Sequence, residues 1–81
     1  MSNIMTDAQL INADRLTNEA IVHAVYGKSV GALALLATAD ASKADVVSLL
    51  KLKRDMAHAR HDSRMTGTIG MLVGMLHWQS L

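Results

Sequence analysis

The triplet Gly27-Lys28-Ser29 has the residue types that close a phosphate-binding loop, in which glycine backbone N–H groups and a lysine hold nucleotide phosphates. Such a loop also needs a glycine five residues before Gly27 and a strand ahead of it. Position 22 is Val22, and the preceding stretch NEAIVHAV is typical of a helix. We therefore interpret the triplet as the interior of a helix and expect no small-molecule substrate.

Two histidines, His58 and His61, could offer imidazole ligands to a metal ion from one helix. Asp55 and Asp62 lie nearby in the sequence, and His77 is a further candidate. A zinc site needs three or four ligands in tetrahedral geometry, and histidines among charged residues are more often solvated. We expect no metal and no cofactor. His58 and His61 remain candidate pH sensors, since imidazole takes up a proton at about pH 6.

Basic residues gather in KLKRDMAHARHDSR, residues 51–64. Two copies of this segment in a dimer could contact DNA phosphates, although it has no aromatic side chain for base stacking and no familiar reading-helix motif. A solvated helix face is the default interpretation. The cations that a nucleic acid or an acidic partner would contact are Lys51, Lys53, Arg54, Arg60 and Arg64.

The sequence contains no recognisable set of catalytic residues. No nucleophile is paired with a base and supporting groups, and the seven carboxylates are scattered over polar helix faces. We expect the protein not to be an enzyme.

The elements that must position these side chains are predicted to be helices. Proline is absent, aromatic residues amount to one tyrosine and one tryptophan, and good helix formers are abundant. We predict an all-α chain of three helices near residues 17–38, 43–60 and 64–78, with a short or frayed helix near 6–15. Residues 1–16 would form an N-terminal segment and residues 17–81 the dimerisation domain.

Helix starts and turns are predicted from capping residues and polar stretches. The turns are expected at TADAS and HDS. The candidate caps are Thr6 with Gln9, Thr17, Ser42 with Asp45, and Ser63 or Thr66.

A chain of 81 residues without cysteine has no disulfide or thiolate zinc site to stabilise it. Its hydrophobic content of 51% favours association, because a second copy can cover apolar surface. We expect a homodimer, with a tetramer left open. The N-terminus does not resemble a signal peptide, and the stretch MTGTIGMLVGML is too short to span a bilayer. These features predict a cytoplasmic protein.

Helical periodicity assigns side chains to faces. Val22 and Met56 are expected on apolar faces of the first two long helices, and a stripe of small residues is expected to allow close helix packing. Met71, Met75 and Trp78 form a second apolar face on the last helix, either a partner interface or dimer core. The residues expected in the dimer interface or core are Ala20, Ala24, Gly27, Gly31, Val25, Leu33, Leu36, Leu49, Leu50, Ile69, Leu72 and Leu76.

The stretches YGKSVGALALL, VVSLLK and IGMLVGML, together with Lys43, resemble the YmgB/AriR and YcgZ family of small enterobacterial regulators of biofilm formation and acid resistance. The resemblance covers about residues 19–76. The matching positions are Tyr26, Gly27, Val30, Leu33, Lys43, Leu49, Leu50, Ile69 and Leu72.

This resemblance implies a short all-α protein that dimerises through its helices and acts without catalysis. Family members are connectors to the Rcs phosphorelay, a two-component signalling system, and one is described as a DNA-binding regulator. The chain departs from the family where Lys53 and Arg54 replace the usual leucine and glutamate, and where HARHDSRMTG replaces an acidic link. These changes reverse the local charge, so a partner contact there does not carry over.

The leading hypothesis is a regulatory protein that binds a signalling protein in stress, biofilm and acid-resistance control. One alternative is a small DNA-binding transcriptional regulator with paired basic helices. Another is a helical chaperone or antitoxin-like module that covers a second polypeptide.

Overall fold

The computed structural model describes residues 4–79, and every regular element among them is a helix, so the all-α class is confirmed. Four helices follow in order: α1 (Asp7–Val25), α2 (Ser29–Ala37), α3 (Lys43–Ala59) and α4 (Ser63–Gln79). The expected division into three main helices and a short N-terminal one is wrong over residues 6–38, where the boundary expected after residue 15 is absent and a break not expected follows Val25. The outer ends of the expected segments 1–16 and 17–81 lie outside the described residues.

The first helix runs without a break across the boundary expected after residue 16. Its start is the predicted capping box: the Gln9 backbone N–H donates to Thr6 Oγ1 at 3.1 Å, and the Thr6 N–H donates to Gln9 Oε1 at 2.9 Å. Thr17, expected as a cap, is fully buried inside α1, where its hydroxyl donates to the Asp14 carbonyl. The helix continues because residues at helical spacing on both sides of Thr17 are buried in the core.

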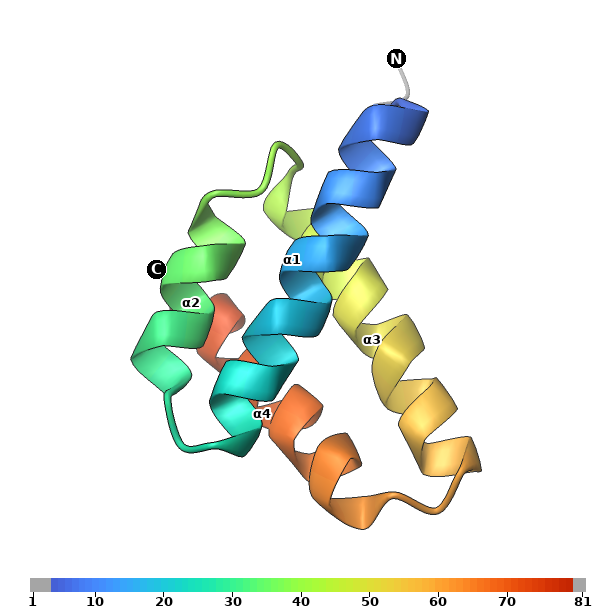
Figure 1. Cartoon of the computed structure of the whole chain (residues 1–81), viewed down its shortest axis with the longest axis vertical. Coiled ribbons are helices and arrows are strands. Elements are labelled where there is room, and N and C mark those ends of the chain that lie inside the picture. Colours follow the sequence, from blue (N-terminus) through green and yellow to red (C-terminus); the bar gives the residue numbers. More distant parts are fainter. Residues whose placement is uncertain (1–3, 80–81) are drawn as a thin grey trace.

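The helix expected over 17–38 is interrupted between Val25 and Ser29. Gly27 has a φ of 81°, a left-handed conformation that is incompatible with a continuing right-handed helix and that glycine adopts at little cost. The chain therefore reverses, and α2 packs back against α1 (Figure 1). Periodicity did not reveal this break, since the apolar pattern continues on both sides of it.

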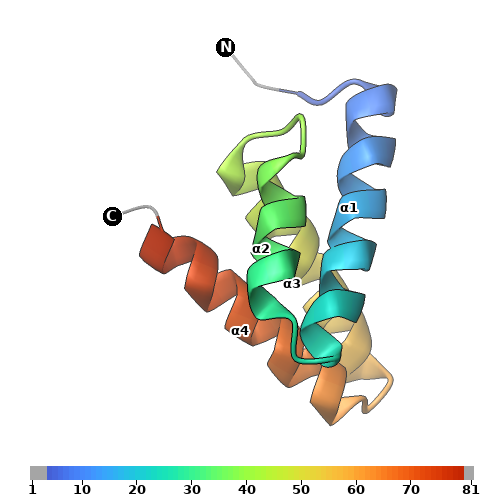
Figure 2. The ribbon, with the colours of Figure 1, turned by 60° about the vertical axis from the view of Figure 1, so that its left-hand side comes forward.

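The four helices form two hairpins that pack on one another. α1 packs along α2, and α3 packs along α4, while α1 also contacts α3 and α4. Figures 1 and 2 show the α1–α2 turn and the α3–α4 turn at the same end of the molecule, away from the N-terminus. The α2–α3 loop, within the predicted TADAS turn, lies at the opposite end (Figure 1).

The core lies where the two hairpins meet, and Leu50, Ile69 and Leu72 are fully buried there. Two side chains expected on apolar faces are more than half exposed: Val22 by 54% and Met56 by 53%. Each lies at the edge of its apolar stripe, beyond the width that the neighbouring helices cover. Helical periodicity fixes the stripe, but only the packing of the other helices fixes how much of it is buried.

Long basic side chains join the elements by polar contacts. Lys43 Nζ donates to the Leu76 carbonyl at 2.8 Å and so ties the start of α3 to the end of α4. Lys53 forms an ion pair with Asp14 across α3 and α1. Cations near the carboxyl end of a helix satisfy carbonyls that have no partner within the helix.

Candidate functional site

The Gly27-Lys28-Ser29 triplet forms the turn between two helices, so its interpretation as helix interior is wrong. The Gly27 N–H donates to the Ala24 carbonyl at 3.0 Å, and the Lys28 N–H donates to the His23 carbonyl at 2.8 Å. This pair of bonds is the Schellman motif that ends a helix. A helix precedes the triplet where a phosphate loop has a strand, and two of the N–H groups already bond carbonyls.

His58 and His61 line a hollow of about 350 Å³ at the α3–α4 turn, together with Asp62 and the start of α4. His61 has a φ of 61°, and the Asp62 carboxylate accepts from the Met65 N–H at 3.1 Å. α4 begins at Ser63, one of the two predicted starts, but its cap is Asp62. Among residues 4–79, no three His, Cys, Asp or Glu side chains are grouped so as to hold a metal ion.

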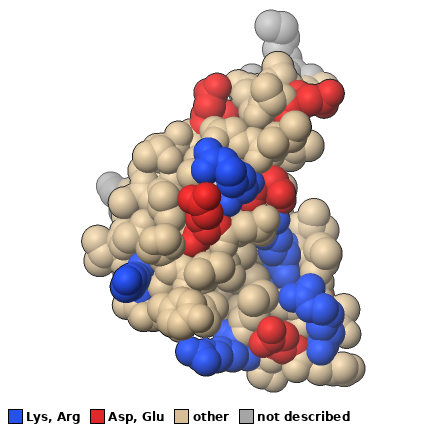
Figure 3. All heavy atoms as spheres, in the orientation of Figure 1, with Lys and Arg blue, Asp and Glu red and all other residues tan. Residues whose placement is uncertain are grey.

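The five predicted phosphate-contacting cations do not form one surface. Lys53 and Arg60 line a groove between helices, whereas Lys51 and Lys53 are separated by about 160° around α3. Arg54 lies 3.8 Å from Asp55 on its own helix. Figure 3 shows Lys and Arg side chains spread over this face, near its centre, at its left side and along its right and lower edges, with Asp and Glu mostly in its upper half.

Arg64, a predicted partner contact, joins the two turns by a hydrogen bond within the chain. Its Nη2 donates to the Val25 carbonyl at 3.0 Å, across 39 positions of sequence. Val25 is the last residue of α1, so its carbonyl has no helical partner and attracts a cation through the helix dipole.

The small residues expected to bring helices together are divided between two places. Ala20 and Ala24 are buried in the core, while Gly27 is exposed in the turn. A side chain at Gly31 would meet the His23 ring at 3.5 Å, so the close approach lies between α1 and α2 of one chain. Most of the other expected core residues are buried, namely Leu36, Leu50, Ile69, Leu72 and Leu76. Three are only half-buried: Val25, Leu33 and Leu49.

The outer side of α4 is an apolar surface that residues 4–79 leave uncovered. Trp78 is 76% exposed and Met71 43% exposed, and Met75 beside them is half-buried. Apart from chain neighbours and the backbone of α4 itself, a Cβ atom added at Gly67, Gly70 or Gly74 would meet no described atom within 4 Å. By helical geometry these six residues occupy about 140° of the circumference, opposite the buried face of α4. We call Gly67, Gly70, Met71, Gly74, Met75 and Trp78 the α4 surface.

Figure 2 shows α1, α2 and α3 all lying on one side of α4. The helix buries Ile69, Leu72, Val73 and Leu76 against them. The α4 surface therefore faces away from the rest of the chain.

A groove of about 270 Å³ lies between α1, α3 and α4. Ile21 and Ile69 are buried at its base, and Val22 and Met56 stand exposed at its sides. The lining is mainly apolar and contains no carboxylate; its remaining residues are Asn18, Lys53, Arg60 and Met65. We call this the three-helix groove.

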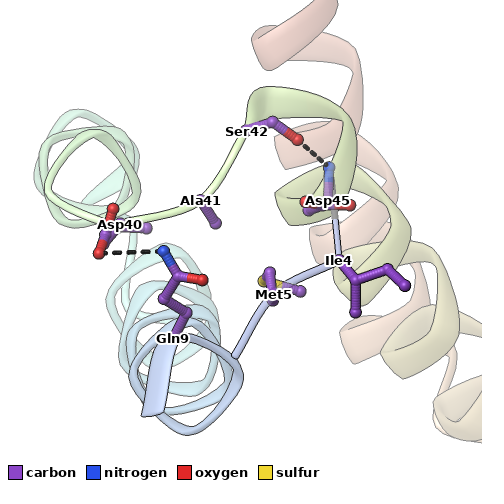
Figure 4. Close-up of a pocket in the computed structure, with 8 residues that line it drawn as sticks. Ile4, Met5, Gln9, Asp40, Ala41, Ser42 and Asp45 are labelled. Atoms are coloured by element: carbon purple, nitrogen blue, oxygen red, sulfur yellow. Dashed lines mark hydrogen bonds between the residues drawn. The ribbon is translucent and has the colours of Figure 1, made fainter. Parts of the chain in front are cut away.

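A larger hollow of about 450 Å³ lies between the N-terminal residues and the α2–α3 loop. Figure 4 shows Gln9 donating to Asp40 at 3.3 Å and the predicted Ser42 cap accepting from the Asp45 N–H at 3.1 Å. Its polar groups are thus engaged in closing the start of α1 against the loop. This arrangement explains the local structure and presents no reactive group.

Comparisons with protein-family models, with curated proteins and with solved structures found no match. Among residues 4–79, no helix combines the length and the apolar character needed to cross a bilayer.

Sequence reasoning placed Met71, Met75 and Trp78 of the α4 surface on one helix face but missed the three-helix groove. The groove combines residues from three helices, and the side chains at its sides, Val22 and Met56, were expected only as members of the apolar faces of their own helices. A usable signal was present in Lys53 and Arg60, which interrupt the apolar face of α3 at helical spacing.

Proposed function

We propose that this chain is a non-enzymatic regulatory protein that works as a homodimer and acts through protein–protein contacts in stress, biofilm and acid-resistance signalling. The observation that carries the proposal is the uncovered α4 surface. A small domain that exposes tryptophan and methionine on one helix face gains stability when a second protein surface covers them.

The three glycines of the α4 surface support a close helix–helix contact. Glycine costs about 1 kcal/mol of helix propensity relative to alanine, so three of them weaken α4 considerably. Packing inside the chain does not require them, because an added Cβ would meet open space at each. A second helix that approaches α4 closely would require them, since a Cβ there would hold the two backbones apart.

We assign the α4 surface to the dimer contact because it lies on one helix and is self-complementary: glycines on one copy can accept Met71 and Trp78 of the other. A two-fold axis lets the same patch serve both copies. The signalling role, as a connector to a phosphorelay, is supported by the family resemblance, which matches Ile69 and Leu72 on the buried side of this helix. The cysteine-free composition agrees with a cytoplasmic location.

Mass in solution tests the dimer, using the variant Met71→Lys and the control Val30→Lys. Val30 is 81% exposed on α2 and lies outside the α4 surface. We expect light scattering to give about twice the chain mass of 8.7 kDa for the wild type and the control, and a single-chain mass for Met71→Lys. Trp78 emission should shift to the blue on association. A wild type that stays monomeric at every concentration would refute the dimer.

Alanine at Gly70 separates a dimer contact from a merely exposed face. If the surface is free, Gly70→Ala stabilises α4 by up to about 1 kcal/mol and leaves the mass unchanged. If two copies meet there, the added methyl group weakens dimerisation. We expect the second result, with Ser48→Ala on the exposed side of α3 as the control that leaves association unchanged.

The regulatory role is tested in the native cell. Expression of the wild type should change biofilm formation and acid survival, and Met71→Lys, present at the same level, should not. Equal effects of the two proteins would show that the dimer is not needed for regulation.

A further inference from the structure

We propose that the three-helix groove is a docking site for an acidic amphipathic helix of a partner protein. The inference rests on the proposed function in that the protein acts through protein–protein contacts, but it assigns the partner to a surface separate from α4. The dimer contact and the partner contact would then be made at the same time by different faces.

The shape of the groove suits apolar anchor residues. Its base, Ile21 and Ile69, is 5% and 0% exposed, while Val22 and Met56 at its sides are more than half exposed. A cavity of about 150 Å³ accommodates a benzene ring, so a groove of about 270 Å³ has room for roughly two apolar side chains. Two anchors at positions i and i+4 of a helix would fill it.

Methionines make the lining adaptable. Met56 of α3 and Met65 of α4 both face the groove. Unbranched thioether side chains adjust to differently shaped apolar groups, which is why such surfaces occur where helical segments are bound.

The charge at the rim selects an acidic partner. Arg60 is exposed, and its guanidinium donates to the Met65 sulfur at 3.6 Å rather than to a carboxylate. Lys53 already pairs with Asp14 beside the groove, so Arg60 carries most of the unbalanced charge. A glutamate or aspartate next to the apolar anchors would gain a charge-assisted hydrogen bond from Arg60.

A protein helix fits these observations better than nucleic acid or a membrane surface. Nucleic acid would leave the apolar groove unfilled, and the lining has no aromatic side chain on which a base could stack. A flat bilayer would not enter a groove whose base is buried between three helices.

The test is fluorescence anisotropy with a labelled amphipathic peptide that has leucines at i, i+4 spacing flanked by glutamates. A second peptide has lysine in place of each glutamate. We expect the protein to bind the glutamate peptide about tenfold more tightly than the lysine peptide, with the preference weakening at high salt. Equal affinities for the two peptides would overturn the proposal.

Paired variants locate the binding. Arg60→Glu should weaken binding of the glutamate peptide about tenfold, whereas Lys51→Glu, outside the groove, should change it less than about twofold. Met56→Lys should weaken it about fivefold, whereas Leu52→Lys, 57% exposed one turn earlier on α3, should again change it less than about twofold. Circular dichroism confirms that each variant is folded. Equal losses in a variant and its control would overturn the assignment.

The same samples distinguish the other occupants. If Met56→Lys or Arg60→Glu lowers the mass from dimer to monomer, a second copy fills the groove and the proposal is wrong. Arg60-dependent binding to vesicles containing phosphatidylglycerol or to duplex DNA, with no peptide binding, would also overturn it. A wild type that is monomeric but binds the glutamate peptide refutes only the proposed dimer; a dimer that binds no peptide refutes only the groove.

Discussion

The α1–α2 and α3–α4 turns, at one end of the molecule, share the same type of backbone conformation but are built from different residues. In the α1–α2 turn, Gly27 has a φ of 81°; in the α3–α4 turn, His61 has a φ of 61°. Each turn is a Schellman motif: the Asp62 N–H donates to the Ala57 carbonyl at 3.0 Å, and the Lys28 N–H makes the matching bond to the His23 carbonyl at 2.8 Å.

Each turn satisfies one local preference and violates another. The first has glycine at the left-handed position, but Lys28, which precedes α2, makes no capping bond through its side chain. The second has the good cap Asp62, but His61 bears the left-handed conformation, which costs a residue other than glycine about 1 kcal/mol or more. A motif can therefore form when half of its local signals are missing, provided that tertiary contacts hold the helices in place.

Those tertiary contacts join the turns to each other. Arg64, in the first turn of α4, donates to the Val25 carbonyl at the end of α1. The packing of α1 on α4 positions both chain reversals together. Four substitutions, taken from the largest expected effect to the smallest, test how much each turn residue contributes to the stability of the protein.

Gly27→Val should destabilise the protein by about 2 kcal/mol, because a β-branched residue is strongly disfavoured at positive φ. Beyond the two chain neighbours of Gly27, no described heavy atom lies within 4 Å of an added Cβ, so the loss would come from the backbone conformation. Urea denaturation measures it, with Tyr26→Val, at a φ of −89°, as the control that changes stability by less than about 0.5 kcal/mol. A similar loss in both variants would remove the role assigned to Gly27.

Asp62→Ala should destabilise by about 1 kcal/mol, because the Met65 N–H loses its acceptor and the start of α4 loses a negative charge. Asp55→Ala, an exposed carboxylate within α3, is the matched control and should be nearly neutral. Thermal denaturation compares the two. An unchanged midpoint for Asp62→Ala would mean that α4 begins independently of its cap.

His61→Gly should stabilise the protein by about 0.5–1 kcal/mol, because glycine relieves the left-handed strain while adding some freedom to the unfolded chain. His58→Gly, in the last turn of α3, should have the opposite sign, since glycine weakens a helix. Urea denaturation of the pair gives both signs. A loss of stability in His61→Gly would show that the imidazole makes contacts worth more than the strain.

Lys28→Asp should stabilise by less than about 0.5 kcal/mol at low salt, because the new anion is favoured at the start of α2 but lies just past the end of α1, where a cation is favoured. The gain should be small, since the ψ of 58° at this residue differs from the extended conformation of a good cap. Salt should abolish the gain, and Lys51→Asp within α3 should show none. A gain that persists at high salt would indicate a direct hydrogen bond instead.

Local signals in the sequence predicted much of the fold. Thr6 and Ser42 cap their helices as expected. The α2–α3 turn coincides with TADAS, and the α3–α4 turn overlaps HDS at His61 and Asp62, because short polar side chains near a chain reversal form a local signal. The break at Gly27 was missed because the apolar period continues through it. The positive φ of His61 could not be predicted, because residues other than glycine seldom adopt the left-handed conformation.

The candidate sites, too, have one part that the sequence predicted and one part that it did not. The sequence determined that Met71 and Trp78 share a face of the last helix opposite Ile69 and Leu72, because helical spacing alone fixes this. Only the tertiary structure decided that this face is uncovered, that Met56 is exposed, and that cations such as Arg64 bond carbonyls within the chain. A residue's own helix sets its direction, but its burial and its partners depend on helices distant in sequence.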